Sequence, residues 1–325
     1  MSQISENPFK YSDTNKRYHT YDYYLRHTFG KKCAKITLDA GMTCPNIDGS
    51  RGVGGCIYCS GGSRSAVCDG LLPLKEQYEN QIRQVKGKWD VDSFIPYLQA
   101  YTNSYTSPEN FKKITDEIAS FEGAVMVDIA TRADCLENEK IEILDTLSRK
   151  IPVTVELGLQ SSDDKTAERI NRCHTYAEFT DCFARIRKHA PRVRIAVHII
   201  DGLPGENREM MLKTASDVAA LKPDIVKIHL LHVIEGTALG GIYKNGEYTP
   251  LTKEEYVSVV CDQLELFSPE TVIERVTGDG ARDSLLAPLW SLKKVAVIND
   301  IDKEMYRRLS YQGIKCKAFD KAQHL

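Results

Sequence analysis

Three cysteines in one short segment carry the most distinctive chemistry of this sequence. Cys44, Cys56 and Cys59 form the pattern C-x11-C-x2-C, with glycines inside it and Tyr58 between the last two cysteines. Glycine allows close backbone approach and positive φ, so three thiolates on such a loop can surround a compact metal centre. Structural zinc sites and electron-transfer clusters take four protein ligands. Three cysteines instead predict a [4Fe–4S] cluster with one iron open to a substrate or cofactor.

The alternative interpretation of these cysteines is a zinc site with a distant fourth ligand. Cys68 lies nine residues beyond Cys59 and is the candidate for that position. The remaining cysteines contain no second C-x2-C pair. That absence argues against an auxiliary cluster, and therefore against sulfur insertion into a substrate.

The elements that position this segment follow from hydrophobic patterning. Short β-rich runs alternate with stretches that present an apolar face at helical spacing. We expect strands at Ala34–Asp39, Phe94–Tyr101, Ala124–Ile129, Val153–Gly158, Val193–Ile200 and Ile225–Val233. We expect helices at Leu72–Trp89, Pro108–Phe121, Asn138–Lys150, Tyr176–His189 and Arg208–Leu221. This alternation predicts a parallel α/β sheet with right-handed crossovers, closed as a partial or full barrel whose carboxyl strand ends carry the site.

Composition and charge narrow the class of protein further. The chain has 325 residues and a net charge of −2, from 43 Lys and Arg against 45 Asp and Glu, so any nucleic-acid site has to be a local patch. The first six residues lack the apolar core of a secretory signal, and no apolar run approaches a membrane span. We therefore expect a cytoplasmic protein with reduced thiols. Segments 1–32 and 246–325 are expected to flank a core of residues 33–245, the last segment containing a helix near Lys253–Phe267, a strand near Thr271–Val276 and a helix near Asp300–Leu309.

Seven further stretches lie at or just beyond predicted strands. They are Thr43–Asn46, Gly55–Cys59, Gln99–Asn103, Ile129–Asp134, Val155–Ser161, Ile170–His174 and His198–Gly205. Together with the cysteine pattern, they resemble the radical S-adenosylmethionine (SAM) superfamily, and within it the YtqA/YhcC-type group related to the Elongator catalytic subunit. The resemblance covers nearly the whole chain. It implies a partial (β/α)6 TIM-like radical SAM barrel with an N-terminal extension and a small α/β C-terminal extension.

The resemblance also implies cofactors and site residues. Cys44, Cys56 and Cys59 would hold a [4Fe–4S] cluster, and SAM would occupy the open iron. Contacts with SAM are implied for Tyr58, Tyr101, Thr102, Arg132, Glu156, Gln160, Arg172, His198 and Leu203. Among these, Tyr58 is expected near the adenine, and the Arg172 guanidinium is expected to pair with the SAM carboxylate because it offers a planar, bidentate fork.

Several of these residues have structural alternatives. Arg172 can be a solvated helix-end residue, and Arg132 can form an ion pair with Asp134. Glu156 can point outward, although a buried carboxylate needs a partner. His198 and His229 lie in apolar strands, where histidine is commonly a hydrogen-bonded core residue.

Two kinds of residue are candidates for contact with the substrate. Strand periodicity places His229 and His232 on opposite faces, and we take His229 as the candidate on the substrate side. Residues 7–32 interleave aromatic and cationic side chains, which suits RNA, and Lys31 and Lys32 are the candidate phosphate contacts. The alternative is that these aromatic residues cap the barrel while the charges are solvated.

The resemblance implies a tRNA substrate modified at the wobble uridine. The expected reaction is conversion of a carboxymethylaminomethyl substituent at C5 to an aminomethyl-type 2-thiouridine, and the expected electron donor is flavodoxin or ferredoxin. Alternatives are a radical SAM enzyme acting on a small metabolite or a protein, and a non-catalytic protein that binds an iron–sulfur cluster or SAM.

Overall fold

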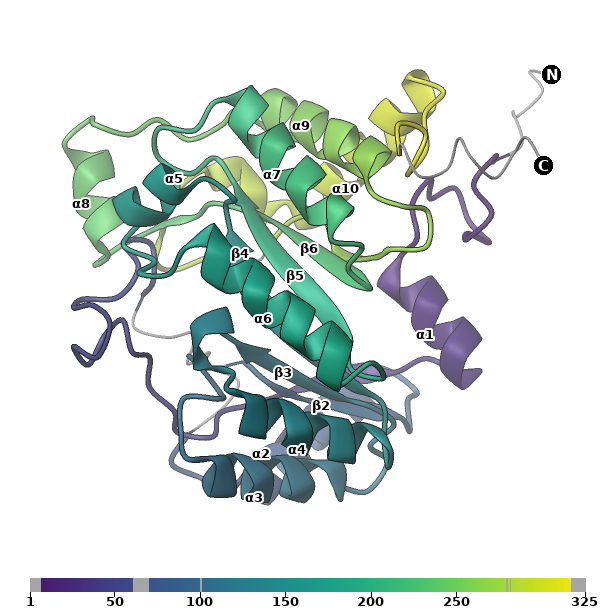
Figure 1. The fold of residues 1–325 in the computed structure, drawn as a ribbon. Coiled ribbons are helices and arrows are strands. Elements are labelled where there is room, and N and C mark those ends of the chain that lie inside the picture. Colours follow the sequence, from purple (N-terminus) through teal and green to yellow (C-terminus); the bar gives the residue numbers. More distant parts are fainter. Residues whose placement is uncertain (1–6, 61–69, 100, 279, 281, 317–325) are drawn as a thin grey trace. The chain divides into compact units, whose positions relative to one another are not determined.

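The computed structural model describes residues 7–60, 70–99, 101–278, 280 and 282–316. The strands of its main sheet follow one another in the order β1-β2-β3-β4-β5-β6-β8, and the registers defined within it are parallel (Figure 1). A second sheet pairs β7 (Val233–Ile234) with β9 (Leu285–Ala287) in antiparallel fashion. The main-sheet strands are β1 (Ala34–Leu38), β2 (Phe94–Leu98), β3 (Val127–Thr131), β4 (Val153–Gln160), β5 (Arg194–Asp201), β6 (Ile225–Leu230) and β8 (Val272–Arg275).

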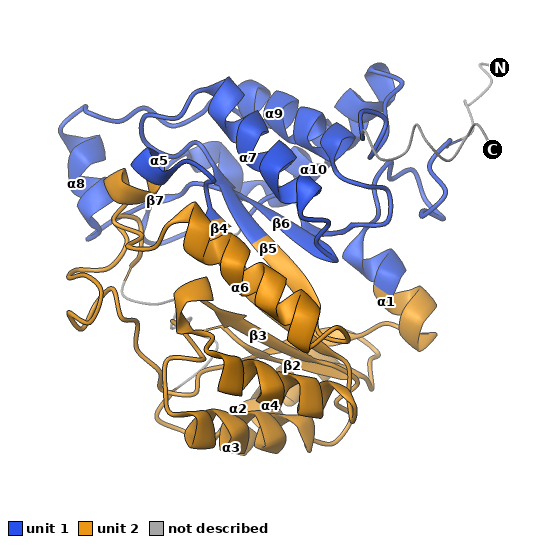
Figure 2. Ribbon diagram, in the orientation of Figure 1, with its two compact units in different colours: residues 1–24, 160–166, 198–325 blue, residues 25–159, 167–197 orange. Residues whose placement is uncertain are grey.

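The chain divides into two compact units, which Figure 2 colours separately. Unit 1 comprises residues 1–24, 160–166 and 198–325, and unit 2 comprises residues 25–159 and 167–197. Within the described residues, no helix combines the length and the apolar character that crossing a bilayer requires.

Unit 2 contains the first four strands and the helices that cover one of their faces. α3 (Pro108–Ala119) contacts α4 (Asn138–Ser148), α4 contacts α6 (Tyr176–His189), and α2 (Leu74–Lys86) packs on β1 (Figure 1). Local sequence sets the helix starts: Ser107 caps α3 ahead of Pro108, and Thr175 with Glu178 forms a capping box at α6. The buried face of β1 consists of its alternate residues, whereas β2 is buried throughout. The carboxyl ends of these strands are therefore fixed by a continuous apolar core.

Unit 1 contains β6, β8 and a layer of helices. α9 (Lys253–Leu266) contacts both α7 (Arg208–Ala220) and α10 (Lys294–Arg307). β8 lies in the predicted C-terminal extension, yet it pairs in parallel with β6, so this segment adds a strand to the main sheet. The predicted boundaries at residues 32 and 245 stay predictions. Counting both units, the shorter helices are α1 (Tyr21–Phe29), α5 (Asp164–Arg169) and α8 (Ala238–Lys244), with 3-10 turns at Ala133–Cys135 in unit 2 and Leu289–Leu292 in unit 1.

Candidate functional site

The cysteine segment forms a folded loop after the carboxyl end of β1. The Ile47 N–H donates to the carbonyl of Cys44 (2.8 Å), and the Cys59 N–H donates to the carbonyl of Cys56 (2.9 Å). Gly55 has a φ of 75°, a conformation that glycine adopts without strain. These features fold the loop on itself, so the three cysteines belong to one compact element, which we call the cluster loop (residues 44–59).

The number of thiols on the cluster loop bears on the kind of metal centre that it can hold. Cys44 and Cys56 are half-buried and Cys59 is exposed. The charges of Cys59 and Cys44 both act on the Cys56 thiol, so the three groups lie near one another. A structural zinc site takes four protein ligands, and these three thiols leave one position open. Cys68, the candidate fourth zinc ligand, lies outside the described residues.

Tyr58 and Cys56 influence each other's ionisation. Burial raises the pKa of the Cys56 thiol to about 11, while the positive charge of Arg132 acts in the opposite direction. Burial likewise raises the pKa of Tyr58 well above its usual range, and the charge of Cys56 adds to this effect. Because metal ions bind the thiolate, cluster assembly has to displace the proton of Cys56. The expected contact between Tyr58 and adenine stays a prediction.

Tyr101 and Thr102 lie on the segment that follows β2 and contacts the cluster loop. Thr102 is buried, and its N–H donates to the carbonyl of Thr43, the residue before the first cysteine (3.2 Å). On the same segment, the hydroxyl of Tyr105 lies 2.6 Å from Oγ of Ser50. Tyr101 itself has a φ of 55°. Both predicted residues therefore lie beside the cluster loop, within the same unit.

Arg132 follows β3. Of the two roles expected for it, contact with SAM and an ion pair with Asp134, the structure shows the ion pair. Its Nε and Nη2 donate to the two carboxylate oxygens of Asp134 at 2.9 and 2.8 Å, and its Nη1 donates to the carbonyl of Arg172 at 2.8 Å. Burial acts to lower the pKa of Arg132, but the hydrogen bond and charge of Asp134 outweigh burial and raise it. Arg132 thus joins the end of β3 to the segment around Arg172. Its contact with SAM stays a prediction.

Arg172 is fully buried rather than solvated at a helix end. Its guanidinium donates to the carbonyl of Leu159 and, through Nε and Nη2, to the carbonyl of His174 at 3.0 and 2.9 Å. Both ring nitrogens of His174 are buried without a hydrogen-bond partner among the described residues, and burial, with the charges of Arg172 and Arg132, lowers the pKa of His174 to about 2. Arg172 therefore holds backbone, and its pairing with the SAM carboxylate stays a prediction.

Glu156 points to partners within the protein. The Lys35 Nζ lies 2.8 Å from Oε1 of Glu156 and 2.6 Å from Oδ2 of Asp128, and the Tyr97 hydroxyl donates to Oε2 of Glu156 at 2.7 Å. Both carboxylates are buried. Glu156 lies four residues before the end of β4, so the partner that a buried carboxylate requires is supplied inside unit 2. Its contact with SAM stays a prediction.

Unit 1 carries the remaining residues predicted to contact SAM. Gln160 ends β4 with a φ of 64°. Leu203 is fully buried in the turn after β5. In that turn Gly202 has a φ of 84°, and its carbonyl accepts a hydrogen bond from the Tyr248 hydroxyl at 2.6 Å. The segment that follows α8 thus fixes the glycine turn. The roles of Gln160 and Leu203 toward SAM stay predictions.

The histidines correct one expectation. The rings of His198 and His229 lie 5.1 Å apart, centroid to centroid. A Cβ placed on Gly278 would lie 3.2 Å from the ring of His232 and 3.9 Å from Nδ1 of His229. His229 and His232 therefore flank the same glycine, and the prediction that they face opposite ways was wrong. β6 ends at Leu230, so strand periodicity no longer applies at His232. The substrate role of His229 and the SAM role of His198 stay predictions.

Lys31 and Lys32 lie at the amino end of β1, whereas the cluster loop follows its carboxyl end. Lys31 Nζ is 3.0 Å from a carboxylate oxygen of Asp92, and Lys32 Nζ is 4.5 Å from the ring centroid of Trp89. Within unit 2 these lysines are therefore separated from the cluster loop by the length of the strand. Any contact that they make with a substrate has to involve a part remote from the reacting atom, and it stays a prediction.

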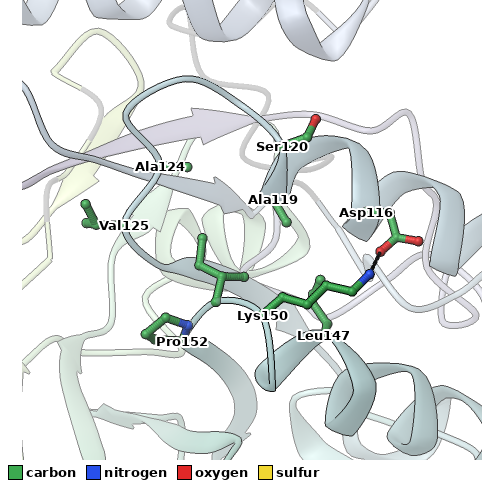
Figure 3. A pocket seen from close by; sticks show the side chains of 9 residues that line it. Asp116, Ala119, Ser120, Ala124, Val125, Leu147, Lys150 and Pro152 are labelled. Atoms are coloured by element: carbon green, nitrogen blue, oxygen red, sulfur yellow. Dashed lines mark ion pairs between the residues drawn. The ribbon is translucent and has the colours of Figure 1, made fainter.

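A hollow of about 640 Å³ also lies at the amino ends of the strands (Figure 3). Its wall is formed by ends of α3 and α4 and by the residues that precede β3 and β4, including Val125 and Pro152. Its charged groups are Asp116 and Lys150, which lie 3.7 Å apart. These two groups form an ion pair, and the hollow belongs to the sheet edge opposite the cluster loop.

Sequence reasoning assigned no role to two asparagines: one lies inside the cluster loop, and the other binds the loop's backbone. Asn46 and Asn171 both lie in the stretches that carry the family resemblance, but nothing in their type showed which atoms they bind. The residue type of Asn171 could have indicated its backbone conformation, although not its partners, because asparagine adopts positive φ more readily than most residues. In the structure its φ is 55°.

Comparison with known families identifies the class of protein. The model of the radical SAM superfamily matches residues 48–218, and the model of the Radical_SAM C-terminal domain matches residues 223–307. The chain therefore belongs to the radical SAM superfamily, whose cofactors are a [4Fe–4S] cluster and SAM, as predicted. The three free thiols of the cluster loop fit that cluster, because they leave one iron open to SAM.

Individual relatives place the chain within the superfamily. YtqA of Bacillus subtilis is 40% identical over 311 residues, which cover 95% of this chain and 96% of YtqA. The tRNA uridine(34) acetyltransferase of Methanocaldococcus jannaschii is 29% identical over 194 residues, 58% of this chain and 33% of that protein. The solved structure of Methanocaldococcus infernus Elp3 with an N-terminal deletion (1–46) has a TM-score of 0.62 at 19% identity; the match covers 86% of this chain and 64% of that truncated chain. The YtqA/YhcC-type assignment and the partial-barrel fold are thus confirmed.

Proposed function

We propose that this radical SAM enzyme modifies the C5 side chain of the wobble uridine in tRNA. The observation that carries the proposal is the similarity over 58% of the chain to a protein named for action on uridine 34 of tRNA. That similarity spans only a third of the relative, so it supports a shared substrate class and not a shared reaction. The matching segment of this chain is joined to its own C-terminal domain at residues 223–307.

The roles of this chain's residues follow from their positions. Cys44, Cys56 and Cys59 would hold the cluster, and together with SAM the cluster supplies a 5′-deoxyadenosyl radical. Tyr58 would lie near the adenine, and the backbone at Tyr101 would accept hydrogen bonds from the SAM ammonium. The remaining contacts with SAM would come from Thr102, Arg132, Glu156, Gln160, Arg172, His198 and Leu203, with His229 toward the substrate.

The proposed reaction converts a carboxymethylaminomethyl group to an aminomethyl group. A hydrogen atom would pass from the methylene between nitrogen and carboxylate to the 5′-deoxyadenosyl radical, giving 5′-deoxyadenosine, and both neighbours would stabilise the substrate radical that remains. A carrier of the flavodoxin or ferredoxin class would donate the electron that cleaves SAM. Loss of one electron from the substrate radical, back to this carrier, and of one proton gives an imine. Water then hydrolyses the imine to the primary amine and a two-carbon aldehyde acid. We place this reaction in the cytoplasm, where tRNA and these carriers occur.

The test is an anaerobic assay with reconstituted, dithionite-reduced protein. It contains SAM, flavodoxin as the electron carrier, and bulk tRNA from cells that lack this gene. Mass spectrometry follows 5′-deoxyadenosine and the tRNA nucleosides. We expect 5′-deoxyadenosine together with loss of the carboxymethylaminomethyl nucleoside. Cys56→Ala should abolish both products, whereas Cys33→Ser, which alters a half-buried cysteine before β1, should retain them.

The outcomes separate the proposed function from its rivals. Formation of 5′-deoxyadenosine with unchanged nucleosides would reject tRNA and favour a small metabolite or a protein as substrate. No 5′-deoxyadenosine from cluster-loaded protein would indicate a non-catalytic role. For the proposed phosphate contacts, charge reversal at Lys31 and Lys32 should weaken tRNA retention and flatten its salt dependence. Unchanged retention would restrict tRNA contact to other surfaces.

A further inference from the structure

The Ile170–Cys173 segment crosses the cluster loop and binds its backbone. The Asn171 side-chain amide donates to the carbonyls of Val53 (3.0 Å) and Gly55 (2.7 Å). One residue earlier, the carbonyl of Ile170 accepts a hydrogen bond from the N–H of Ile57 (3.1 Å). Three hydrogen bonds therefore tie one short segment to the stretch immediately before and after Cys56. All of these residues belong to unit 2.

Asn46 completes this connection from inside the cluster loop. It is fully buried, and its Nδ2 donates to the carbonyl of Asn171 and also lies 3.6 Å from Sγ of Cys56, within hydrogen-bond range for sulfur. Its backbone carbonyl accepts the N–H of Gly55 at 2.8 Å. Asn46 thus contacts a cysteine ligand directly, and the carbonyl of Asn171 fixes the direction of its amide.

Gly52 shows how closely these groups approach one another. A Cβ at this position would meet Oδ1 of Asn46 and would lie 2.6 Å from Sγ of Cys173. Real Cβ atoms do not approach other atoms so closely, so only glycine leaves room for both side chains. The cluster loop is therefore shaped around the Asn46 amide and the Ile170–Cys173 segment.

We propose that Asn171 and Asn46 are positioning residues for the iron–sulfur cluster. Asn171 clamps the backbone around Cys56, and Asn46, oriented by Asn171, donates an N–H···S hydrogen bond to the Cys56 ligand. Hydrogen bonds to ligand sulfurs draw negative charge from them and raise the reduction potential of a cluster. The inference rests on the cluster assignment alone and holds whether or not tRNA is the substrate.

The clamp is tested by iron release from the anaerobically reconstituted protein. In Asn171→Gly the positive φ is retained without strain while both donated hydrogen bonds are lost. In Asn171→Asp the shape is retained but a carboxylate faces two carbonyls. We expect both variants to release iron to a chelator roughly tenfold faster than wild type, as loss of two hydrogen bonds predicts. Asn110→Asp, on α3, controls for the added charge because its amide binds Thr106.

The results for these variants have distinct meanings. If Asn171→Gly released iron at the wild-type rate, the proposed clamp would be overturned, because the residue would then matter only for its backbone conformation. A variant that folds by circular dichroism but takes up no cluster would support the clamp, since the loop would no longer hold its ligands in place.

The N–H···S contact is tested by potentiometric titration followed by electron paramagnetic resonance. We expect Asn46→Ala to lower the reduction potential of the cluster and to alter its spectrum. Asn103→Ala is the matched control: Asn103 is also buried, its Nδ2 donates to a carbonyl, that of Ala130 (3.0 Å), and its Oδ1 likewise lacks a partner among the described residues. An unchanged potential in Asn46→Ala, or an equal drop in both variants, would overturn the proposed contact.

Discussion

Replacing Asp201 with Asn is expected to stabilise the protein by an amount that grows with pH. Asp201 ends β5 and is 1% exposed. Its Oδ1 accepts a hydrogen bond from Nε2 of Gln263 (2.6 Å), and its Oδ2 has no partner among the described residues. Burial raises the pKa of Asp201 to about 8; the hydrogen bond from Gln263 opposes this, and the charge of Glu206 adds to it.

The size of the effect follows from proton linkage. The unfolded chain releases the Asp201 proton near pH 3.9, whereas the folded protein holds it to about pH 8. Between these values the folded state binds the extra proton, so the contribution of Asp201 to stability is complete below pH 4 and declines as pH rises. The decline is about 1.4 kcal/mol per pH unit, or about 2.7 kcal/mol from pH 5 to pH 7. Asn does not titrate, so the variant gains this difference relative to wild type.

The assay is urea unfolding of cluster-loaded protein at pH 5, 6, 7 and 8, followed by tryptophan fluorescence. Trp290, whose Nε1 donates to the carbonyl of Leu251 (3.2 Å), reports on the unit that contains Asp201. The control is Glu255→Gln at the capping box of α9. Hydrogen bonds from Thr252 lower the pKa of Glu255, so its contribution is lost only as pH falls through that pKa. A constant difference between Asp201→Asn and wild type across pH 5 to 8 would refute a protonated Asp201.

Three further substitutions test other contacts of the site. Arg132→Lys removes the bidentate pair with Asp134, and we expect the free energy of unfolding measured with urea to fall by about 2 to 4 kcal/mol. A fall below about 0.5 kcal/mol would show that the pair does not stabilise the fold. Lys35→Met removes the cation that pairs with two buried carboxylates, so the free energy of unfolding should fall by about 3 to 5 kcal/mol. An unchanged midpoint of urea unfolding would contradict this expectation. Tyr248→Phe removes the hydrogen bond to Gly202, and equilibrium dialysis should show SAM binding weakened roughly fivefold; unaltered binding would separate this turn from the SAM site.

The elements that were easiest to predict are those whose residues interact mainly with their neighbours in sequence. The helix Tyr176–His189 was predicted at both ends, because its capping box and its apolar face are local features. The predicted strand Ile225–Val233 was too long: β6 ends at Leu230, and the next N–H, that of Leu231, binds the carbonyl of Asp201. The end of β6 thus depends on a residue that is distant in the sequence, and hydrophobic patterning carries no information about such a contact.

The site shows the same division between local and distant information. The cysteine ligands were found because their spacing is itself the signal. Arg172 was expected to bind SAM from its type and family position, yet its guanidinium is surrounded by the carbonyls of Leu159 and His174. An arginine has the same fork for a carboxylate and for main-chain carbonyls, so residue type alone does not separate the two uses.

Backbone conformation links the segments around the site. Among the described residues, six that are not glycine have positive φ. Two of them, Lys222 and Leu309, lie two residues beyond the ends of helices α7 and α10. The other four are Tyr101, Gln160, Asn171 and Cys173, and all lie in stretches that carry the family resemblance. Glycine would adopt this conformation at lower free energy, by about 1 kcal/mol or more per residue. At Asn171 the side chain offsets this cost, because its amide donates two hydrogen bonds to the cluster loop.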